Sequence, residues 1–420
     1  MVGPITKTDI TTFGCRLNAF ESEVMLAHAK SAGLRNTHIV NTCAVTAEAG
    51  RQARQAIRKL RRDHPQGTII VSGCAAQINP DSFADMPEVD RVLGNEEKLR
   101  ADAYLSPAKQ AAVQVSDIMQ VREIAGHLVS GFESRTRAFV QIQQGCDHRC
   151  TFCIIPYGRG NSRSVPLGFL ADQIRGLVDT GHREVVLTGV DISSYGRDLP
   201  GSSTLGSMCS RLLAHVPELD RLRLSSIDPA VVDKHLIRLI EHERRLMPYL
   251  HLSVQAGSDL VLKRMKRRHT RQDIIDLCRR IRERRPDVVF GADIIVGFPT
   301  ETADDFQATL DLVDEAGLTY LHVFPYSVRE GTPAARMPQL PKAVRKQRSA
   351  LLREKGDATK TMFFDSLIGT KASVLSERSG RGYTEHFAPV KLLGDLEPGQ
   401  VFNVRITGHA DQALLAERLS

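Results

Sequence analysis

Three cysteines that lie close together in the chain are the residues best suited to chemistry. Cys146, Cys150 and Cys153 follow a C-x3-C-x2-C spacing within the segment QQGCDHRCTFCIIPYGRG. Thiolates bind metals, and closed sites built from thiolates use four of them. No fourth Cys or His follows at zinc-finger spacing, although His148 lies inside the loop. Idle thiols and a zinc site remain alternatives, but an iron–sulfur cluster with one iron left without a cysteine explains three ligands better.

A second set of three cysteines shares a common position relative to the predicted strands. Cys15, Cys43 and Cys74 each follow a short β-rich segment, DITTF, THIV and GTIIVSG respectively. Open α/β sheets bind their ligands along the edge formed by the carboxyl ends of the strands. We therefore predict that these three cysteines meet at one sheet edge. The remaining pair, Cys209 and Cys278, lies on apolar stripes at helical spacing and is predicted to be core.

Composition places the chain among globular proteins with reduced thiols. Its 420 residues carry a net charge of +7, which is compatible with a polyanionic partner. No N-terminal segment resembles a signal peptide, and the longest apolar runs are too short to span a bilayer. We expect a cytoplasmic protein with no membrane association, in which cysteines serve metal or redox chemistry before disulfides.

Alternating strand and helix patterns predict an α/β protein with three domains, residues 1–125, 131–362 and 363–420. The first alternates β-rich and helical segments and predicts a small parallel sheet, followed by a polar linker near residues 101–134. The second carries six β-rich segments at crossover spacing, which predicts a partial or complete (β/α) barrel: RAFVQIQ, EVVLTGV, RLRLSSI, YLHLSVQ, VVFGADIIVGF and YLHVFPYS. The third has short alternating strands typical of a small all-β barrel.

The cysteine loop, with Phe152 before its last cysteine and a (β/α) barrel after it, resembles the radical S-adenosylmethionine (SAM) enzymes. The resemblance implies that Cys146, Cys150 and Cys153 hold a [4Fe–4S] cluster whose open iron chelates SAM. In that family an electron from the cluster splits the cofactor to give a 5′-deoxyadenosyl radical. Such reductive chemistry belongs to cofactors and is outside the reach of side chains.

Segments along nearly the whole chain resemble the methylthiotransferases within that superfamily. They are TFGCRLNAFESE, NTCAVTAEA, SGCAAQ, CTFCIIPYGRGNSRS, LTGVDISSYG, RLRLSSIDP, HLSVQAGSDLVLKRMKRRHT and ADIIVGFPTET. The resemblance implies a second [4Fe–4S] cluster on Cys15, Cys43 and Cys74, whose open iron carries the transferred sulfur. It also implies a central radical-SAM partial barrel and a C-terminal TRAM-like barrel.

Methylthiotransferases differ in substrate, and the GCRLN segment around Cys15 looks most like the group that acts on N6-threonylcarbamoyladenosine in tRNA. The resemblance thus implies conversion of that nucleoside at position 37 to its 2-methylthio derivative. Isopentenyl-adenosine tRNA and a ribosomal-protein aspartate are the alternatives within the family. The chain departs from the family where Gln144 stands before Gly145, a position often occupied by Asp.

Other candidate residues are predicted to bind the cofactor; none is assigned a catalytic role beyond the two clusters. Gly189 and Asp191 follow the second barrel strand, where an ordinary turn is the alternative. Gln255 ends a strand and is predicted to point into the barrel mouth, although a buried structural amide is equally compatible. Gly297 permits close backbone approach to adenine. The full set of cofactor candidates is Phe152, Tyr157, Gly189, Asp191, Ser225, Gln255, Gly297 and Pro299.

Basic segments predict contact with RNA phosphates. Residues 261–285 carry eleven Lys or Arg against three Asp or Glu, and Arg51–Arg62 and Lys342–Lys355 are also basic. Solvated helix faces are the alternative. The expected partners are a tRNA anticodon stem-loop, with Tyr383 and Phe387 available for stacking, and an electron donor such as a flavodoxin or ferredoxin. A non-catalytic, zinc-stabilised RNA-binding protein is the alternative of another class.

Overall fold

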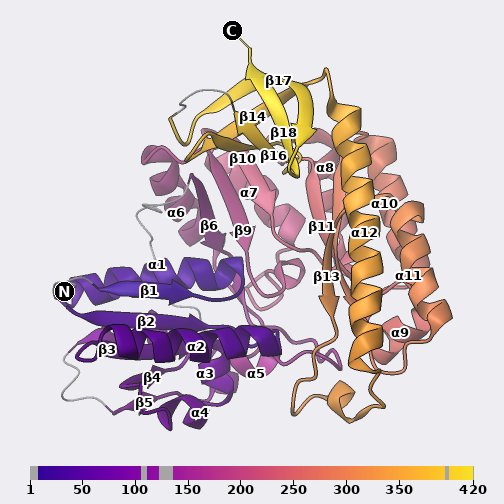
Figure 1. Ribbon diagram of the computed structural model, residues 1–420. Helices are drawn as coiled ribbons and strands as arrows, with labels where there is room; N and C mark the ends of the chain where they lie inside the picture. Colours follow the sequence, from indigo (N-terminus) through magenta and orange to yellow (C-terminus); the bar gives the residue numbers. More distant parts are fainter. Residues whose placement is uncertain (1–7, 106–110, 123–135, 393–396, 420) are drawn as a thin grey trace.

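The computed structural model describes residues 8–105, 111–122, 136–392 and 397–419, and these form three units around one central sheet (Figure 1). The N-terminal unit is a parallel sheet in the order β1-β2-β3-β4-β5. Its strands are Asp9–Thr12, Thr37–Thr42, Thr68–Gly73, Arg91–Leu93 and Val113–Gln114. Its helices are α1 (Arg16–Ser31), α2 (Ala47–Asp63), α3 (Cys74–Ile78) and α4 (Asp81–Ala84), with 3-10 turns at Glu97–Leu99, Ala101–Tyr104 and Ile118–Gln120.

Strand-to-helix turns in this unit place its three cysteines at the carboxyl edge of the sheet, as predicted. Cys15 is the N-cap of α1, and Cys74 is the first residue of α3. Gly73 has φ +100°, and a Cβ there would lie 2.3 Å from the carbonyl oxygen of Thr42. Only glycine fits this turn without strain, so Gly73 fixes the point at which Cys74 emerges from β3.

The predicted linker from residue 101 to 134 starts too early. Residues 101–104 form a 3-10 turn, and β5 at Val113–Gln114 pairs in parallel with β4 of the N-terminal sheet. A two-residue strand at a sheet edge carries no detectable periodicity, which is why the polar composition was read as linker. Residues 106–110 and 123–135 lie outside the described residues.

The central unit contains the six predicted parallel strands, which form a partial barrel. They are β6 (Arg137–Gln141), β9 (Glu184–Thr188), β10 (Arg221–Leu224), β11 (Tyr249–Gln255), β12 (Val289–Val296) and β13 (Leu318–Pro325). They pair as β6-β9-β10 and β11-β12-β13. Parallel bridges Leu222–Leu246 and Ile227–Leu252 join the two halves.

Amphipathic helices cover the outer face of the partial barrel and bury its core. They are α6 (Leu167–Asp179), α7 (Leu205–His215), α8 (Lys234–His242), α10 (Arg271–Arg284) and α11 (Ala303–Glu315), with 3-10 turns at Ile192–Ser194, Pro229–Val231 and Pro333–Arg336. Shorter pieces are β7 (Gln143–Gln144), β8 (Arg163–Ser164), α5 (Ile155–Arg159) and α9 (Asp259–Arg264). Cys209 and Cys278 are fully buried among these helices, as predicted.

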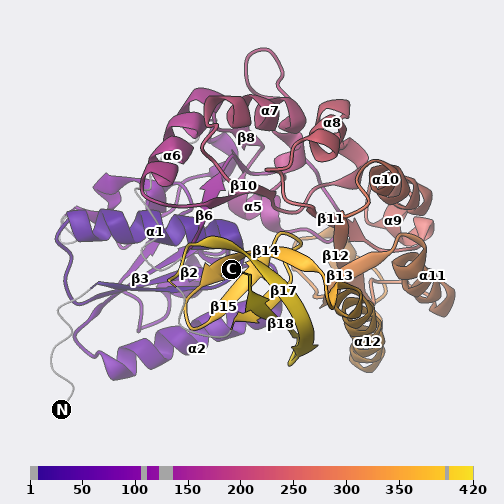
Figure 2. The ribbon, with the colours of Figure 1, turned by 90° about the horizontal axis from the view of Figure 1, so that it is seen from above.

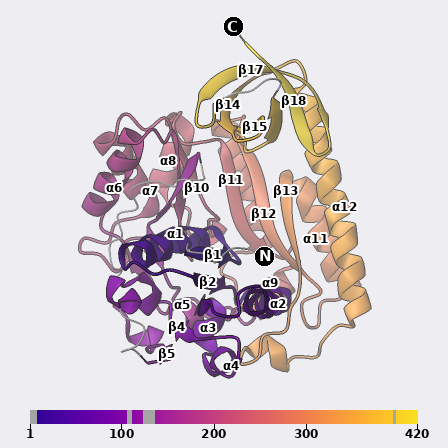
Figure 3. The same cartoon turned by 60° about the vertical axis from the view of Figure 1, so that its left-hand side comes forward.

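The inner face of the partial barrel is polar, and the N-terminal unit covers its open side. Tyr249, His251, Asp293, Tyr320 and His322 contact one another from β11, β12 and β13, so they project to the same side. We call the space that they face the lumen. Figures 2 and 3 show the N-terminal unit beside the central strands.

The interface between the N-terminal unit and the central partial barrel contains both apolar contacts and a hydrogen bond. Phe20 and Val24 of α1 belong to the same buried core as Ala138 of β6. On the β13 side, the Ala47 amide donates to Ser327 Oγ at 3.2 Å. Both edges of the open barrel are therefore closed by the first unit.

A closed five-stranded barrel ends the chain, in the order β14-β15-β16-β18-β17. Its strands are Lys371–Glu377, Arg381–Thr384, Pro389–Leu392, Val401–Ala410 and Ala413–Arg418; the last was not anticipated, although the all-β barrel was. Helix α12 (Lys342–Leu367) runs along β13 into this barrel (Figure 1) and buries Phe364 in its core. The predicted boundary at residue 363 thus falls within α12. No helix in the described ranges has the length and apolar character needed to cross a membrane.

Candidate active site between two cysteine triads

The second cysteine triad, Cys146, Cys150 and Cys153, lies in a loop that is pinned at both sides. Gly145 has φ +72°, and a Cβ there would lie 1.9 Å from the carbonyl oxygen of Asn161. The Thr151 amide donates to the Met265 carbonyl at 3.1 Å, and Thr151 Oγ1 donates to the Arg264 carbonyl at 2.8 Å. These backbone contacts hold the loop over the carboxyl ends of the central strands.

Burial raises the pKa values of two thiols in this loop. Burial, with the neighbouring Asp191 carboxylate, raises the pKa of Cys146 to about 12. Burial also raises the pKa of Cys153 to about 11. Thiols of such pKa are protonated at neutral pH, so thiolate formation here requires a metal that displaces the protons.

The first triad, Cys15, Cys43 and Cys74, converges at the sheet edge. Cys43 and Cys74 are buried, whereas Cys15 is accessible. Burial raises the pKa of Cys43 to about 11. A Cβ at Gly14, the residue before Cys15, would lie 2.9 Å from Cys43 Sγ, so the turn that carries Cys15 approaches Cys43. The Val45 amide donates to Cys43 Sγ at 3.4 Å, a type of contact that stabilises thiolates bound to iron.

Arg159 of α5 joins the two triads. Its Nε donates to Cys74 Sγ at 3.0 Å, and its guanidinium also pairs with Glu21 of α1. Lys98 Nζ donates to the same carboxylate at 2.6 Å. Arg159, Glu21 and Lys98 are 1%, 0% and 0% exposed, respectively. Because α5 begins two residues after Cys153, this network places the two cysteine loops against each other.

Glu21 remains ionised inside this network. Burial alone would raise its pKa, but Arg159 and Lys98 outweigh burial and lower it to about 2. Gln144, the position at which the sequence departs from its family pattern, donates to Glu21 Oε1 at 3.2 Å. Its amide therefore belongs to the contact between the N-terminal unit and the barrel.

A cavity of about 240 Å³ lies between the two triads. Its walls come from both units: Val45 and Thr46, directly after Cys43, and Cys153 itself. Asp293 and Gln255 of the central strands complete it. A cavity of this size is somewhat smaller than the usual range for ligand sites and is on the scale of a nucleobase.

The donor sets of the two triads suit iron–sulfur clusters. Cys209 and Cys278 are buried in the core, so each triad offers three thiolates. A structural zinc site closes with four ligands, whereas all-thiolate sets are typical of iron–sulfur clusters.

The predicted cofactor residues nearest the second triad are Phe152, Asp191 and Gln255. Asp191 Oδ2 accepts from Ser194 Oγ at 2.6 Å and lies 3.3 Å from His148 Nε2. Phe152 and Gln255 line the cavity, and Gln255 has φ +72°. Strained backbone at a non-glycine residue is typical of functional sites.

The other predicted cofactor residues pack against neighbouring parts of the protein or lie near its surface. A Cβ at Gly189 would lie 2.7 Å from the Gln143 carbonyl oxygen, and one at Gly297 would lie 2.4 Å from Arg345 Cγ. Ser225 and Pro299 are buried, and Tyr157 is half exposed. Their contact with SAM stays a prediction.

The rings of Tyr383 and Phe387, predicted to be available for stacking on RNA, are partly exposed and also pack within the protein. Phe387 stacks on Tyr249 at 5.5 Å between ring centroids and on Tyr383 at 5.0 Å. The guanidinium carbons of Arg137 and Arg223 lie 5.0 Å from its ring centre. Phe387 therefore closes the lumen at the amino-terminal ends of the strands.

Several cations of the basic segment 261–285 are paired within the fold, whereas Lys263, Lys266 and Arg280 are exposed. Arg271 pairs with Glu315 at 2.5 Å, Arg279 with Asp276 at 2.6 Å, and Arg284 with Glu241 at 2.8 Å. On α2, the exposed Arg58 and Arg62 have no hydrogen-bond or ion-pair partner in the described ranges. Helix α2 therefore carries free positive charge toward its C-terminal end, and its N-terminal end follows the cavity residues Val45 and Thr46.

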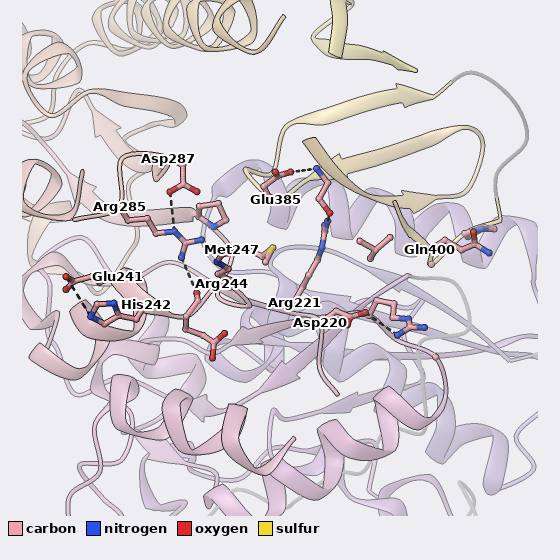
Figure 4. A pocket seen from close by; sticks show the side chains of 18 residues that line it. Asp220, Arg221, Glu241, His242, Arg244, Met247, Arg285, Asp287, Glu385 and Gln400 are labelled. Atoms are coloured by element: carbon pink, nitrogen blue, oxygen red, sulfur yellow. Dashed lines mark hydrogen bonds and ion pairs between the residues drawn. The ribbon is translucent and has the colours of Figure 1, made fainter. Parts of the chain in front are cut away.

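A larger hollow of about 1310 Å³ lies at the other end of the central strands, against the C-terminal barrel. Figure 4 shows that charged side chains of both signs surround it. Arg183 pairs with Asp220 at 3.2 Å, and Arg285 pairs with Asp287 at 3.3 Å. None of the six cysteines lines this hollow, and its charges compensate one another, so it is not the site of the chemistry.

Sequence reasoning missed the charged residues that position the site. The sequence gives no role to Arg159, which lies within the cysteine motif, or to Glu21 and Lys98. Charged residues in such segments are ordinarily exposed to solvent. The ion pairs of Glu21 with Arg159 and Lys98 become visible only when the three segments are brought together in the fold.

Comparisons with known proteins agree with this arrangement. The Radical SAM superfamily matches residues 140–313, and the Uncharacterized protein family UPF0004 matches residues 7–94. The radical SAM methyltransferase TsrM from Kitasatospora setae has a similar fold, with a TM-score of 0.60 at 13% identity over 79% of this chain and 74% of that one. The barrel and its three-cysteine loop thus define a radical SAM protein.

Full-length relatives define the family. The threonylcarbamoyladenosine tRNA methylthiotransferase MtaB of Rickettsia prowazekii is 53% identical over 96% of this chain and 95% of its own. The tRNA-2-methylthio-N(6)-dimethylallyladenosine synthase of Cereibacter sphaeroides is 36% identical over 98% of both chains. The chain belongs to the methylthiotransferase family, in the branch of its MtaB relatives.

Proposed function

We propose that this protein is a tRNA methylthiotransferase that replaces the C2 hydrogen of N6-threonylcarbamoyladenosine 37 with a methylthio group. The observation that carries the proposal is the cavity between the two cysteine triads, which Cys153 of one triad lines together with Val45 and Thr46, the residues that follow Cys43 of the other. A C–H bond of an adenine has no reactivity toward ordinary nucleophiles. Two metal centres facing one cavity suit a reaction that must both remove that hydrogen and deliver sulfur.

The six cysteines have the right number and spacing to hold two [4Fe–4S] clusters, Cys15, Cys43 and Cys74 for one, and Cys146, Cys150 and Cys153 for the other. When bound, these clusters supply the electron for reductive cleavage of SAM and the sulfur for transfer. The electron comes from a donor such as a flavodoxin or ferredoxin. Reduced thiols in both sets suit the cytoplasm.

The chain's own residues position and seal the site. Arg159 and Glu21 fix the distance between the triads, and the packing of α1 on β6 excludes water from the join. Phe387 closes the far end of the lumen. Arg58 and Arg62 provide phosphate contacts for the RNA, whose binding is expected to weaken with salt.

The threonylcarbamoyl substrate is favoured over the dimethylallyl one by the relatives. Relatives named for the first substrate reach 53% identity, whereas those named for the second reach 36%. Nucleoside mass spectrometry of tRNA from a deletion strain tests the choice. Loss of 2-methylthio-N6-threonylcarbamoyladenosine, restored by the wild-type gene and not by Cys150→Ala, is expected. An unchanged level of this nucleoside would overturn the proposal.

A further inference from the structure

Arg16 reaches from the N-terminal unit into the lumen. It is the first residue of α1 and directly follows Cys15. Its guanidinium carbon lies 5.6 Å from the centre of the Phe387 ring. Its electrostatic neighbours include Tyr249 of β11 and Asp293 of β12. The side chain therefore extends from the first triad toward the inner face of the partial barrel.

No side chain of the described ranges pairs directly with Arg16, although the Asp293 carboxylate acts on it from a distance. Within the described ranges it has no hydrogen-bond or ion-pair partner. The two other arginines around Phe387 are both paired, Arg137 with Glu377 at 2.7 Å and Arg223 with Glu184 at 3.0 Å. The Arg16 side chain is partly buried. A guanidinium in such surroundings is costly unless an anion reaches it.

The position of Arg16 restricts which anion that is. Arg16 follows Cys15 in the chain, and its guanidinium extends into the lumen toward Phe387. The threonylcarbamoyl group on N6 ends in a carboxylate, whereas a dimethylallyl group carries no charge. A guanidinium matches a carboxylate with two parallel hydrogen bonds.

We propose that Arg16 binds the carboxylate of the N6-threonylcarbamoyl group and thereby selects this nucleoside over uncharged N6 derivatives. This inference rests on the proposed function. Asp293, which accepts from Ser226 Oγ and lies 3.0 Å from His251 Nε2, forms the polar wall on the barrel side. That wall suits the hydroxyl and ureido N–H groups of the same substituent.

Synthetic anticodon stem-loops test the assignment, each carrying either N6-threonylcarbamoyladenosine, its carboxylate methyl ester, or the dimethylallyl nucleoside. Methylthiolation kinetics are measured for wild type, Arg16→Gln and Arg16→Lys. Arg16→Gln is expected to raise KM for the acid about 10- to 100-fold, the range for a hydrogen bond to a charged group, with a much smaller change in kcat. Arg16→Lys restores part of the loss.

The methyl ester substrate distinguishes loss of carboxylate recognition from structural damage caused by the Arg16 substitution. Wild type and Arg16→Gln are expected to process the ester with similar KM, because the charge that Arg16 would read is absent. Arg35→Gln, an exposed cation of the same unit, serves as the matched control and leaves KM unchanged. Because Cys15 is adjacent, iron content and RNA-independent formation of 5′-deoxyadenosine must equal those of wild type.

The outcomes distinguish this inference from the proposed function. Unchanged KM for the acid in Arg16→Gln, or equal losses for acid and ester, would overturn the role of Arg16 while the activity itself stands. Failure of the wild-type protein to modify the acid-bearing stem-loop would overturn the proposed function instead.

Discussion

Arg159 Nε lies 3.0 Å from the sulfur of Cys74, although 85 positions separate the two residues. Arg159 follows the second cysteine loop, and Cys74 belongs to the first set. One buried side chain thus bridges the two metal-binding regions. Glu21, which pairs with Arg159 and Lys98, fixes that bridge to α1.

Replacing Arg159 is expected to damage stability and metal content together. Arg159→Met keeps much of the volume but leaves Glu21 with one cationic partner, so the free energy of unfolding should fall by about 3 kcal/mol. Denaturant unfolding and iron analysis measure both effects. Arg175→Met, which removes an exposed pair with Asp172, should change either quantity little. Equal losses in the two variants would contradict a specific role for Arg159.

Each cysteine triad is expected to hold its cluster independently. Anaerobically reconstituted wild type should contain roughly eight irons. Cys43→Ala should remove about half of them and still allow SAM cleavage, whereas Cys150→Ala should abolish cleavage. Cys278→Ala, a change in the buried core, should keep the iron and lose only stability. Iron retained in full by Cys43→Ala would argue against the first cluster.

The buried pair between Glu184 and Arg223 predicts a pH dependence of stability. Burial alone would raise the pKa of Glu184, but Arg223 outweighs burial and lowers it. A lowered pKa means that the ionised form stabilises the fold above the unfolded-state pKa of about 4.3. This contribution is lost as the pH falls through the folded-state pKa.

Glu184→Gln tests that dependence. At neutral pH the variant should be less stable than wild type by about 3–5 kcal/mol, and the gap should narrow below about pH 4. Urea unfolding between pH 7 and 3 measures it. Asp102→Asn, at an exposed ion pair with Arg100, should track wild type throughout. A gap that stays constant with pH would show that Glu184 does not titrate as argued.

Gln255 combines a strained backbone with a place in the cavity wall. Its φ of +72° favours glycine, so Gln255→Gly should leave stability unchanged or raise it by up to about 1 kcal/mol. Its amide would be lost, and SAM affinity, measured by calorimetry, should fall. Asn36→Gly, at another positive φ (50°) away from the cavity, should not affect SAM binding. Unaltered affinity in Gln255→Gly would assign the amide a structural role.

The elements and the metal ligands could be predicted because their signals are local. The six barrel strands are β-rich segments with recurring apolar residues, and cysteine spacing is visible without a structure. Two-residue β5 and the last barrel strand, β18, lack such signals. Glu21, Lys98 and Arg16 could not be assigned because their roles arise from contacts between segments far apart in the chain. The packing of Phe387 on Tyr249 could not be assigned either, because it joins the C-terminal barrel to β11.

Helix α12 sets the geometry between the two ends of the molecule. Its 26 residues span about 39 Å, with Arg345 packed beside Gly297 at one end and Phe364 within the C-terminal barrel at the other. One inserted residue would turn the barrel by about 100° and advance it by about 1.5 Å. The number of residues in α12 therefore fixes the orientation of the C-terminal barrel, and of any ligand bound to it, relative to the cavity between the cysteine triads.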